Sequence, residues 1–391
     1  MQNRVYLDWN ATTPLRREAR EAMAAAWDLG GNPSSVHAEG RRARGLVEDA
    51  RSAVAEAVGG DARNVILTSG GTESNALALT PGMPGRSGQA IERLIVSAIE
   101  HASVLAGGQF APDQIEILPV QRSGLVDRDI LAGMLADGAP ALVSAMLANN
   151  ETGAIQPIAA IADLVREARG LLHVDAVQAF GKIPFDINEL KVDLVSLSAH
   201  KIGGPTGAGA LVVAADLAAP KALIRGGGQE KGRRAGTENV PAIAGFGAAV
   251  KAAMAARRTD MERIETLRNR LEHGLRQTQG NGKSAVIFAD GVARLPNTTL
   301  FGVPGLKAET AIIGFDLEGV AVSSGSACSS GKVQPSHVLE AMGYGPELAK
   351  GAIRFSLGWE TTDADIEWAL KAWRKLASAL LKGHETVLER F

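Results

Sequence analysis

The sequence predicts an α/β protein built on a mostly parallel β-sheet with helices on both faces. Short runs rich in β-branched and aliphatic residues alternate with stretches of helical periodicity across residues 35–213. Glycine clusters separate many of these runs, as is typical of tight turns between strands and helices. Polar residues follow several of the runs directly, at the carboxyl ends of strands where such sheets bind ligands.

Seven β-rich runs supply the strands of this seven-stranded sheet. They are Asn64–Thr68, Arg93–Ser97, Gln114–Leu118, Ala141–Met146, Leu171–Val174, Val192–Leu197 and Ala208–Val213. Helical periodicity covers Ser35–Val58 before the first run, and Arg128–Ala136 and Ile158–Arg169 between later ones. Helices between successive strands predict the parallel connections.

A second, smaller α/β domain is expected toward the C-terminus. A helical stretch rich in Ala, Arg and Glu runs from Pro241 to about Arg276. Short strands and two helices follow it: Ala285–Phe288, Thr298–Phe301, Ala308–Leu317, Ala352–Ser356 and Asp363–Leu381. We expect a large domain at 15–257 and a small one at 1–14 and 258–391, so that the first dozen residues pack beside the second unit.

The composition excludes several function classes. The 391 residues are 46% hydrophobic and 21% charged, as in ordinary globular proteins. A net charge of −2 offers no electrostatic attraction to nucleic acid or an anionic membrane. No apolar run approaches the roughly 20 residues that span a bilayer, and Met1–Asp8 lacks the apolar stretch of a secretory signal. We expect a cytoplasmic protein with neither nucleic-acid nor membrane partners.

The chain has a single cysteine, Cys328, in a stretch of serines and glycines from Ser323 to Gly331. One thiol cannot form an intramolecular disulfide or a multi-cysteine metal site. Cysteine is usually a buried, inert side chain, yet serine and glycine neighbours favour a mobile, solvated loop. Local sequence leaves both a reactive and an incidental thiol open.

Two polar clusters follow strands of the predicted sheet. Thr68–Asn75 joins a strand to a helix, and its glycines and Thr72 are suited to an anion at the helix N-terminus, although an ordinary capped helix start fits as well. Asp175 follows another strand, with Gln178 three residues later. A helix cap, a metal ligand and a partner for a cationic ring all fit Asp175. No metal-ligand spacing accompanies it, so metal is disfavoured.

A lysine marks the third cluster. Lys201 follows an apolar strand and precedes a glycine-rich turn, with small rather than charged neighbours. Most lysines are solvated surface groups, but a desolvated lysine can form a Schiff base with a carbonyl compound. An anion cradle, an acid and this lysine together match pyridoxal 5′-phosphate, which needs all three.

Motifs along nearly the whole chain carry a family resemblance. The chain is similar to the cysteine desulfurases of the NifS/IscS type, within the class V aminotransferase-like group. That resemblance implies a pyridoxal-phosphate-dependent transferase of fold type I. The matching segments are residues 6–8, 10–14, 31–37, 71–74, 100–101, 149–153, 173–178, 198–201, 233–239, 323–330 and 353–358.

The resemblance implies roles for the residues around the cofactor. Lys201 would hold the cofactor covalently and move protons at the substrate carbon. His101 would stack on the pyridine ring and act in acid–base steps, although a histidine capping a helix start is the simpler interpretation. Asp175 would pair with the ring nitrogen, and Gln178 would hydrogen-bond the phenolic oxygen.

The resemblance also implies a phosphate site and a substrate site. The phosphate would be held by Gly71, Thr72, Ser198 and His200, with Thr237 reaching in from the partner subunit of a homodimer. Asn150 would contact both cofactor and substrate. Asn32 and Arg354 would bind the substrate carboxylate, a role suited to the planar guanidinium.

The implied reaction converts L-cysteine to L-alanine and leaves a persulfide on Cys328. The thiolate form of Cys328 would attack the substrate sulfur, and a loop extending to Pro335 suits a thiol that must also reach an acceptor. The acceptor would be a protein such as an iron–sulfur scaffold, for cluster assembly or thiolation. No intrinsic metal is expected, with Cys328 at most a transient iron–sulfur ligand.

Alternatives within the fold are a selenocysteine lyase, another class V aminotransferase or an epimerase. A partner protein without activity is a further alternative, which intact Lys201, Asp175, His101 and Cys328 disfavour. The chain departs from the family pattern at Thr206, where lysine is usual, and at Ala199, where glycine also occurs. Housekeeping members carry a tail beyond the position of Phe391 that engages the scaffold, so docking on a scaffold is left open.

Overall fold

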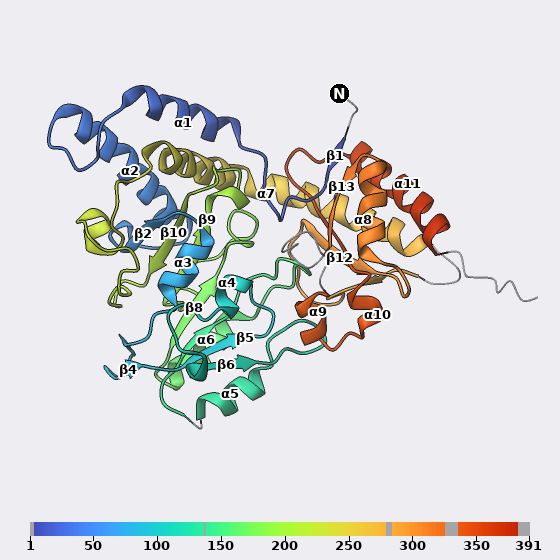
Figure 1. The fold of residues 1–391 in the computed structure, drawn as a ribbon, viewed down its shortest axis with the longest axis horizontal. Helices are drawn as coiled ribbons and strands as arrows, with labels where there is room; N and C mark the ends of the chain where they lie inside the picture. The colour runs from blue at the N-terminus through green and yellow to red at the C-terminus, as the bar shows by residue number, and fades with distance from the viewer. Residues whose placement is uncertain (1–3, 137, 279–283, 325–334, 382–391) are drawn as a thin grey trace, which may run out of the picture.

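The computed structural model describes residues 4–136, 138–278, 284–324 and 335–381 of the chain. Within them, a seven-stranded and a four-stranded sheet organise two lobes, which Figure 1 shows side by side. Helix α7 (Val240–Gln277) runs from the first lobe into the second (Figure 1). None of the helices in the described ranges is long and apolar enough to cross a membrane.

The larger sheet confirms the mostly parallel seven-stranded prediction. Its order is β2-β10-β9-β8-β7-β5-β6, with every neighbouring pair from β9 to β6 parallel and β10 antiparallel to β2 and β9. Every predicted run of the sheet forms a strand, with ends shifted by a few residues at most. The strands are β2 (Val65–Thr68), β5 (Leu94–Ser97), β6 (Ile115–Leu118), β7 (Leu142–Ser144), β8 (Leu171–Asp175), β9 (Leu194–Ser198) and β10 (Gly209–Val213).

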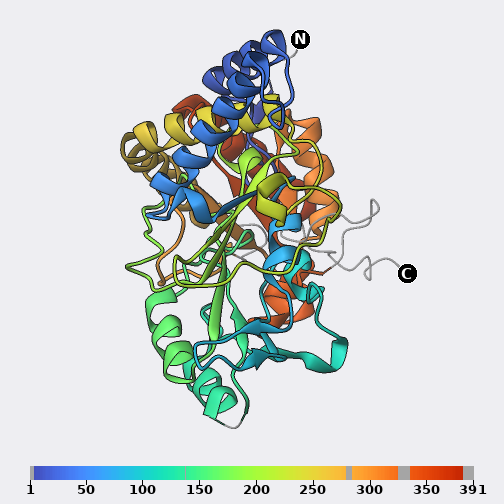
Figure 2. The same cartoon turned by 90° about the vertical axis from the view of Figure 1, so that its left-hand side faces the viewer.

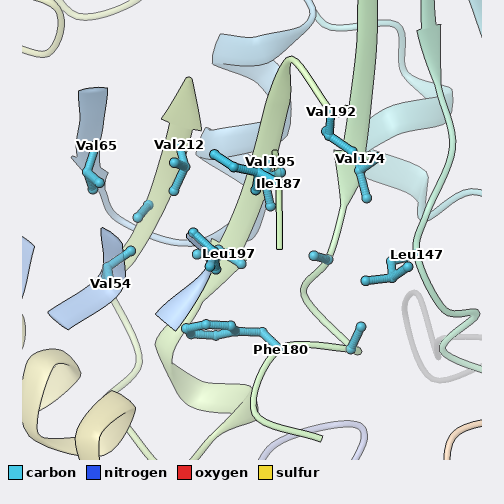
Figure 3. Close-up of a cluster of buried hydrophobic side chains, with 14 of the residues drawn as sticks. Val54, Val65, Leu147, Val174, Phe180, Ile187, Val192, Val195, Leu197 and Val212 are labelled. Carbon is cyan, nitrogen blue, oxygen red and sulfur yellow. The ribbon is translucent and has the colours of Figure 1, made fainter. Parts of the chain in front are cut away.

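Both faces of this sheet are buried, because alternate side chains of each strand point to opposite sides. In β10, Ala210 and Val212 join one apolar core, and Leu211 and Val213 join the other. Figure 3 shows the first core, where side chains of β2, β8, β9 and β10 converge. Side chains from α2 (Ala38–Ala57), α5 (Arg128–Ala136), α6 (Ile158–Glu167) and the first half of α7 complete this core. Side chains from α3 (Gly71–Ala78) and α4 (Ala102–Leu105) complete the core on the opposite face of the sheet.

Helix α1 (Arg17–Leu29) was not predicted from the sequence. It packs against α7 and α2, and Figure 2 shows these helices gathered at one end of the molecule. Only Ala19 and Ala26 are buried in it. An alanine stripe is a weak apolar pattern, so tertiary packing rather than periodicity identifies this helix.

The smaller sheet is antiparallel, in the order β11-β12-β15-β14. Strand β1 (Val5–Tyr6) pairs in parallel with β13 (Val320–Ala321), so the first residues pack beside this lobe as expected. The strands of the smaller sheet are β11 (Val286–Ile287), β12 (Thr298–Gly302), β14 (Ser323–Ser324) and β15 (Ile353–Ser356). Its helices are α8 (Ala308–Leu317), α9 (His337–Ala341), α10 (Pro346–Ala349) and α11 (Asp363–Leu380), and the short strands β3 (Met83–Pro84) and β4 (Ala90–Ile91) pair with each other in the first lobe.

The start of the predicted cysteine loop is corrected by the structure. Ser323 and Ser324 form strand β14, in which Ser323 pairs with Arg354 and Ser324 with Ile353. Main-chain pairing does not depend on side-chain polarity, so a serine pair can complete a sheet edge despite its loop-like composition. The loop prediction therefore fails for these two residues.

Helix α7 contributes to both lobes in turn. Phe246 and Val250 belong to the core under the larger sheet, and Met254 packs against it. Ile264 and Leu267 belong to the core of the smaller lobe. The apolar core that α7 helps to build therefore changes between Met254 and Ile264.

Candidate active site

A cavity of about 570 Å³ lies between the two lobes, at the carboxyl ends of the parallel strands. The cavity floor consists of residues that end or follow β8 and β9: Asp175, Gln178, Ser198 and Lys201. These strands are parallel neighbours, and Asp175 pairs with Ser196, so their ends deliver both sets of side chains to one place. Most of the predicted site residues line this cavity, namely Gly71, Thr72, His101, Asn150, Asp175, Gln178, Ser198, His200, Lys201 and Arg354.

The cavity wall comes from the smaller lobe and from the N-terminal segment. It consists of Asp8, Ile312, Val322 and Arg354. The pairing of β14 with β15 brings Ser323 beside Arg354 at the same wall. The smaller lobe thus adds a guanidinium and apolar side chains to a cavity whose floor is polar.

One end of the cavity floor offers hydrogen-bond donors suited to an anion. Helix α3 begins at Gly71 and Thr72 directly after β2, so its first N–H groups lack intrahelical partners. A Cβ atom on Gly71 would lie 2.8 Å from Cγ2 of Val177, which leaves room only for glycine. Ser198 adds a buried hydroxyl at the end of β9.

His200 also lines the cavity, in the turn after β9. Burial lowers its pKa to about 4, with the cations of Lys201 and Lys182 acting in the same direction. The imidazole is therefore neutral at physiological pH. Its Nδ1 atom lies 3.2 Å from the hydroxyl oxygen of Thr12. A neutral ring can donate one N–H to an anion.

Asp175 is buried without a cationic partner among the ion pairs of the described residues. Its Oδ2 accepts from Nδ2 of Asn75 at 2.8 Å, and its Oδ1 accepts from the backbone N–H of Val177 at 2.9 Å. Burial is the largest influence on the carboxyl group and raises its pKa. A cation arriving in the cavity would stabilise the ionised form.

Lys201 extends from the turn after β9. Its Nζ donates to the backbone oxygens of Asn10 at 2.6 Å and Ala11 at 2.7 Å. Burial lowers its pKa to about 8, and the nearby Arg354 adds to this, against the opposing influence of Asp8 and Asp175. A larger share of the amine is therefore neutral near pH 7 than for an exposed lysine, as an attacking amine requires.

His101 serves as a helix cap and also lines the cavity. Its Nδ1 accepts from the backbone N–H of Ser103 at 3.1 Å and lies 2.8 Å from the Ser103 hydroxyl oxygen. Because Nδ1 is an acceptor, the proton of the neutral ring is on Nε2. Burial lowers the pKa of His101. Both sequence interpretations of this histidine are therefore compatible with its position.

Arg354 is buried and fixed on two sides. Its Nη2 donates to Oδ1 of Asp8 at 2.8 Å, and its Nη1 donates to the backbone oxygen of Asn150 at 3.0 Å. Its Nε is buried and has no partner within the described chain. The guanidinium is therefore oriented before any substrate arrives.

Two predicted residues lie away from the cavity in this single chain. Asn32 is exposed, and its Oδ1 accepts from the backbone N–H of Ser34 at 2.8 Å. Thr237 is exposed and lines a separate hollow of about 210 Å³ beside Thr68 and Ser69. Their predicted contacts with substrate and cofactor stay predictions.

Cys328 lies outside the described residues. Ser324 and Pro335 are the nearest described residues on its two sides. After Pro335, the Ser336 hydroxyl donates to Oε2 of Glu151 at 2.5 Å, and Nε2 of His337 lies 3.0 Å from the backbone oxygen of Glu100. These contacts attach α9 to residues that adjoin His101 and Asn150 in sequence.

Several residues of the site had no assigned role in the sequence analysis. Asn75 and Ser103 connect Asp175 to His101, because Nδ2 of Asn75 also donates to the Ser103 hydroxyl at 2.9 Å. Asn10 accepts from Lys201 and lies at the centre of a hydrogen-bond network. Asp8, Asn10 and Asn75 lie in or beside motifs of the family resemblance, which is the only sequence signal that could have found them.

The donor set fits pyridoxal 5′-phosphate on structural grounds. A buried carboxylate that belongs to none of the ion pairs among the described residues, a glycine whose Cβ would clash with Val177, and a lysine with a lowered pKa line one cavity. Asp175 would hold the ring nitrogen, Lys201 the aldehyde carbon, and the end near Gly71 the phosphate. Across the described residues, no group of three or more His, Cys, Asp or Glu could hold a metal ion.

Comparison with known proteins gives a family match over most of the chain. The family model described as aminotransferase class-V matches residues 5–368. The cysteine desulfurase IscS of Dictyoglomus turgidum is 41% identical over 384 residues, covering 97% of this chain and 96% of that protein.

Solved structures agree in fold. The NifS-like protein from Rickettsia africae has a TM-score of 0.86 and 38% identity, covering 96% of this chain and 99% of that one. SspA in complex with cysteine has a TM-score of 0.72 and 30% identity, covering 92% of this chain and 100% of that one. The fold predicted from the family resemblance is therefore confirmed.

Proposed function

Because this chain belongs to the class V aminotransferase family, we propose that it acts as a pyridoxal-phosphate-dependent cysteine desulfurase. It converts L-cysteine to L-alanine and retains the sulfur on the enzyme. The observation that carries this proposal is a single cavity that holds an unpaired carboxylate, a lysine of lowered pKa and an oriented guanidinium. The cysteine desulfurase IscS of Dictyoglomus turgidum matches over nearly the full length of both chains, and the similar SspA was solved in complex with cysteine.

Each residue of the cavity has its own role in the proposed reaction. Pyridoxal phosphate, when bound, supplies an electron sink for bond breaking at the substrate. Arg354 binds the substrate carboxylate by the Nη N–H groups that the bonds to Asp8 and Asn150 leave free. Lys201 anchors the cofactor through its amine and then moves protons at the substrate α-carbon. His101 holds a proton on Nε2 for acid–base steps over the ring.

Cys328 performs the sulfur transfer. Its thiolate attacks the sulfur of L-cysteine, so a sulfur–sulfur bond forms while the bond between sulfur and the β-carbon breaks. The electron pair of the broken bond goes to carbon, which takes a proton and leaves as part of L-alanine. A persulfide remains on Cys328, and an acceptor then removes its outer sulfur.

The proposal includes a cytoplasmic homodimer that passes sulfur to another protein. Thr237 and Asn32 lie outside the cavity of their own chain, which fits a role at a neighbouring subunit's cavity. The acceptor is a sulfur-handling protein such as an iron–sulfur scaffold, and Cys328 could bind iron transiently during that transfer.

We also propose that residues 15–257 form one domain, and residues 1–14 and 258–391 the other. The change of core along α7 between Met254 and Ile264 supports this boundary. The pairing of β1 with β13 supports the assignment of the N-terminal segment.

The deciding experiment is incubation of the purified protein with L-cysteine and a reductant, with alanine and sulfide both measured. The parental protein should form them in equal amounts, and mass analysis without reductant should find one added sulfur on Cys328. The Cys328→Ser variant should form neither product. Alanine release by that variant at the parental rate would exclude the persulfide mechanism and favour a selenocysteine lyase or aminotransferase.

A further inference from the structure

A second lysine lies behind the cavity floor and has no place in the proposed reaction. Lys182 is 7% exposed and is not among the residues that line the cavity. It lies in the turn after β8, four residues beyond Gln178, so both side chains share one face of that turn. Figure 3 shows Phe180 of the same turn packed under Leu197, which fixes the turn to the sheet.

Lys182 is held by oxygens of neutral groups only. Its Nζ donates to Oε1 of Gln178 at 2.9 Å, to the backbone oxygen of Gln178 at 3.0 Å and to Oδ1 of Asn10 at 3.4 Å. None of the ion pairs found among the described residues includes Lys182. Three N–H groups thus meet three acceptors, and two of these belong to one glutamine.

This contact determines which way the Gln178 amide faces. A lysine ammonium has only donors, so the amide atom beside Nζ must be the oxygen. The amide nitrogen is then turned to the other side, where Nε2 donates to the backbone oxygen of Asn10 at 3.0 Å. That same oxygen accepts from Nζ of Lys201. Gln178 therefore presents N–H groups, rather than its oxygen, on the side of Lys201 and the cavity.

We propose that Lys182 is a positioning residue that keeps Gln178 a hydrogen-bond donor toward the phenolic oxygen of the bound cofactor. This proposal rests on the proposed function, because it assumes that pyridoxal phosphate occupies the cavity floor. Lys182 acts through Gln178 and touches neither cofactor nor substrate. Without it, the Gln178 amide could rotate and turn its oxygen toward the phenolic oxygen, where two acceptors would repel each other.

The oxygens around Lys182 favour its ammonium form, in which Nζ has only donors. Burial lowers its pKa to about 7, and the cations of Lys201 and Arg354 act in the same direction. The form that orients the Gln178 amide is therefore present at and below neutral pH. None of the ion pairs among the described residues joins a carboxylate to Lys182, so its replacement leaves none of those carboxylates without its partner.

The test is a pH titration of the visible absorption band of the bound cofactor in the Lys182→Met variant. A donor to the phenolic oxygen stabilises the more negative form of the cofactor, so its loss raises the pH midpoint of that titration. We expect a rise of about one pH unit, a tenfold change in proton affinity. The matched control is Lys251→Met on the exposed face of α7, which should titrate at the parental midpoint.

A double-mutant cycle separates positioning from a general effect of Lys182. In a Gln178→Ala background, Lys182→Met should produce no further shift, because the group through which it acts is gone. An unchanged midpoint in Lys182→Met would overturn the proposal. A shift of equal size in the Gln178→Ala background would overturn it as well.

A second variant keeps the proposal testable if Lys182→Met does not fold. Gln178→Glu preserves the shape of the side chain and gives Lys182 a carboxylate, but leaves no N–H for the cofactor. The proposal expects the same upward shift of the midpoint, and an unchanged midpoint would overturn it. Alanine formation by the parental protein is measured in parallel, so that failure of the proposed function is seen separately from failure of the Lys182 role.

Discussion

The cavity floor and the cavity wall carry charge in opposite ways. On the floor, Asp175 belongs to none of the ion pairs of the described residues, and Lys201 is held by the backbone oxygens of Asn10 and Ala11. On the wall, Arg354 already has its counter-charge in Asp8 at 2.8 Å. The described ion pairs thus leave the Asp175 carboxylate on the floor without a cation, whereas the Arg354 guanidinium on the wall already has an anion as its partner.

This difference corresponds to two kinds of ligand. A buried charge without a partner is destabilising by several kcal/mol, so the floor is suited to a cofactor that stays bound and supplies the missing charge. A guanidinium that already has a partner can share its remaining edge with a carboxylate that enters and leaves in every turnover. The following predictions test this contrast, from the largest expected effect to the smallest.

Removal of the amine on the floor should have the largest effect. The Lys201→Ala variant should lose the covalent link to the cofactor and form alanine at least about 10³-fold more slowly, because proton movement at the substrate carbon is lost too. The measurements are the visible spectrum and the rate of alanine release. A variant that kept a tenth of the parental rate would contradict the assigned role.

Loss of the Asp175 carboxylate on the cavity floor should have the second-largest effect on alanine formation. Asp175→Asn preserves the shape of the side chain but removes the charge that holds a protonated ring nitrogen. We expect alanine formation to fall about 10²- to 10³-fold at saturating cofactor, the range for losing one aligned electrostatic contact. Equal rates in Asp175→Asn and the parental protein would show that the floor needs no charge.

The guanidinium on the wall should affect substrate binding more than turnover. Arg354→Lys loses the planar fork and its contacts with Asp8 and Asn150. Loss of a buried charged contact costs about 2 kcal/mol or more, so KM for L-cysteine should rise about 30-fold. A fall in kcat with an unchanged KM would instead place Arg354 among the reacting groups.

Removal of the counter-charge of Arg354 should change KM for L-cysteine less than Arg354→Lys does, and in the opposite direction. Asp8→Asn keeps an oxygen near Arg354 but removes the anion that competes with the substrate carboxylate. A partly exposed pair of this kind is worth about 0.5–1 kcal/mol, so KM should fall about two- to fivefold. Steady-state kinetics at low salt gives the clearest comparison. A rise in KM would mean that orientation by Asp8 outweighs competition.

The last prediction concerns stability rather than rate. Burial raises the pKa of Glu100 from 4.5 to about 8, and its Oε2 has no partner in the described chain. Between these pH values the folded state binds a proton that the unfolded state releases. Stability should therefore fall as pH rises through this window, by up to about 1.4 kcal/mol per pH unit.

Glu100→Gln should remove that pH dependence. A glutamine oxygen can still accept from the Ser97 hydroxyl at 2.7 Å and from the backbone N–H of Met146 at 2.7 Å. Denaturant unfolding at pH 6 and pH 8 measures the effect in both proteins. Parallel changes in the free energy of unfolding would show that Glu100 is not the group responsible.

Much of the fold could be predicted because most strands and helices of an α/β protein have their own hydrophobic pattern in the local sequence. Apolar β-rich runs identified every strand of the larger sheet, and helical periodicity gave α5 and α8 with the observed ends. The pattern failed where an element depends on a distant partner. Strands β1 and β14 each have two residues and exist through pairing with β13 and β15.

The candidate site likewise contains residues that the sequence could identify and residues that it could not. Chemically distinctive residues such as Lys201 and Asp175 could be found from their position after a strand. Asn10 and Lys182 could not, because their roles arise from contacts with Gln178, which is far from Asn10 in sequence. Hydrogen-bond networks of this kind leave no periodic trace.

The sequence alone determined the class of the fold and the cofactor, and it supplied candidate groups for the chemistry, because these depend on residue type and on order along each strand. The tertiary structure alone decided how those groups are charged and oriented. Burial between two lobes sets the pKa values of Lys201 and Asp175, and contacts across more than 300 residues pair Arg354 with Asp8. Desolvation and such distant contacts exist only in the folded chain, so no local pattern could have predicted them.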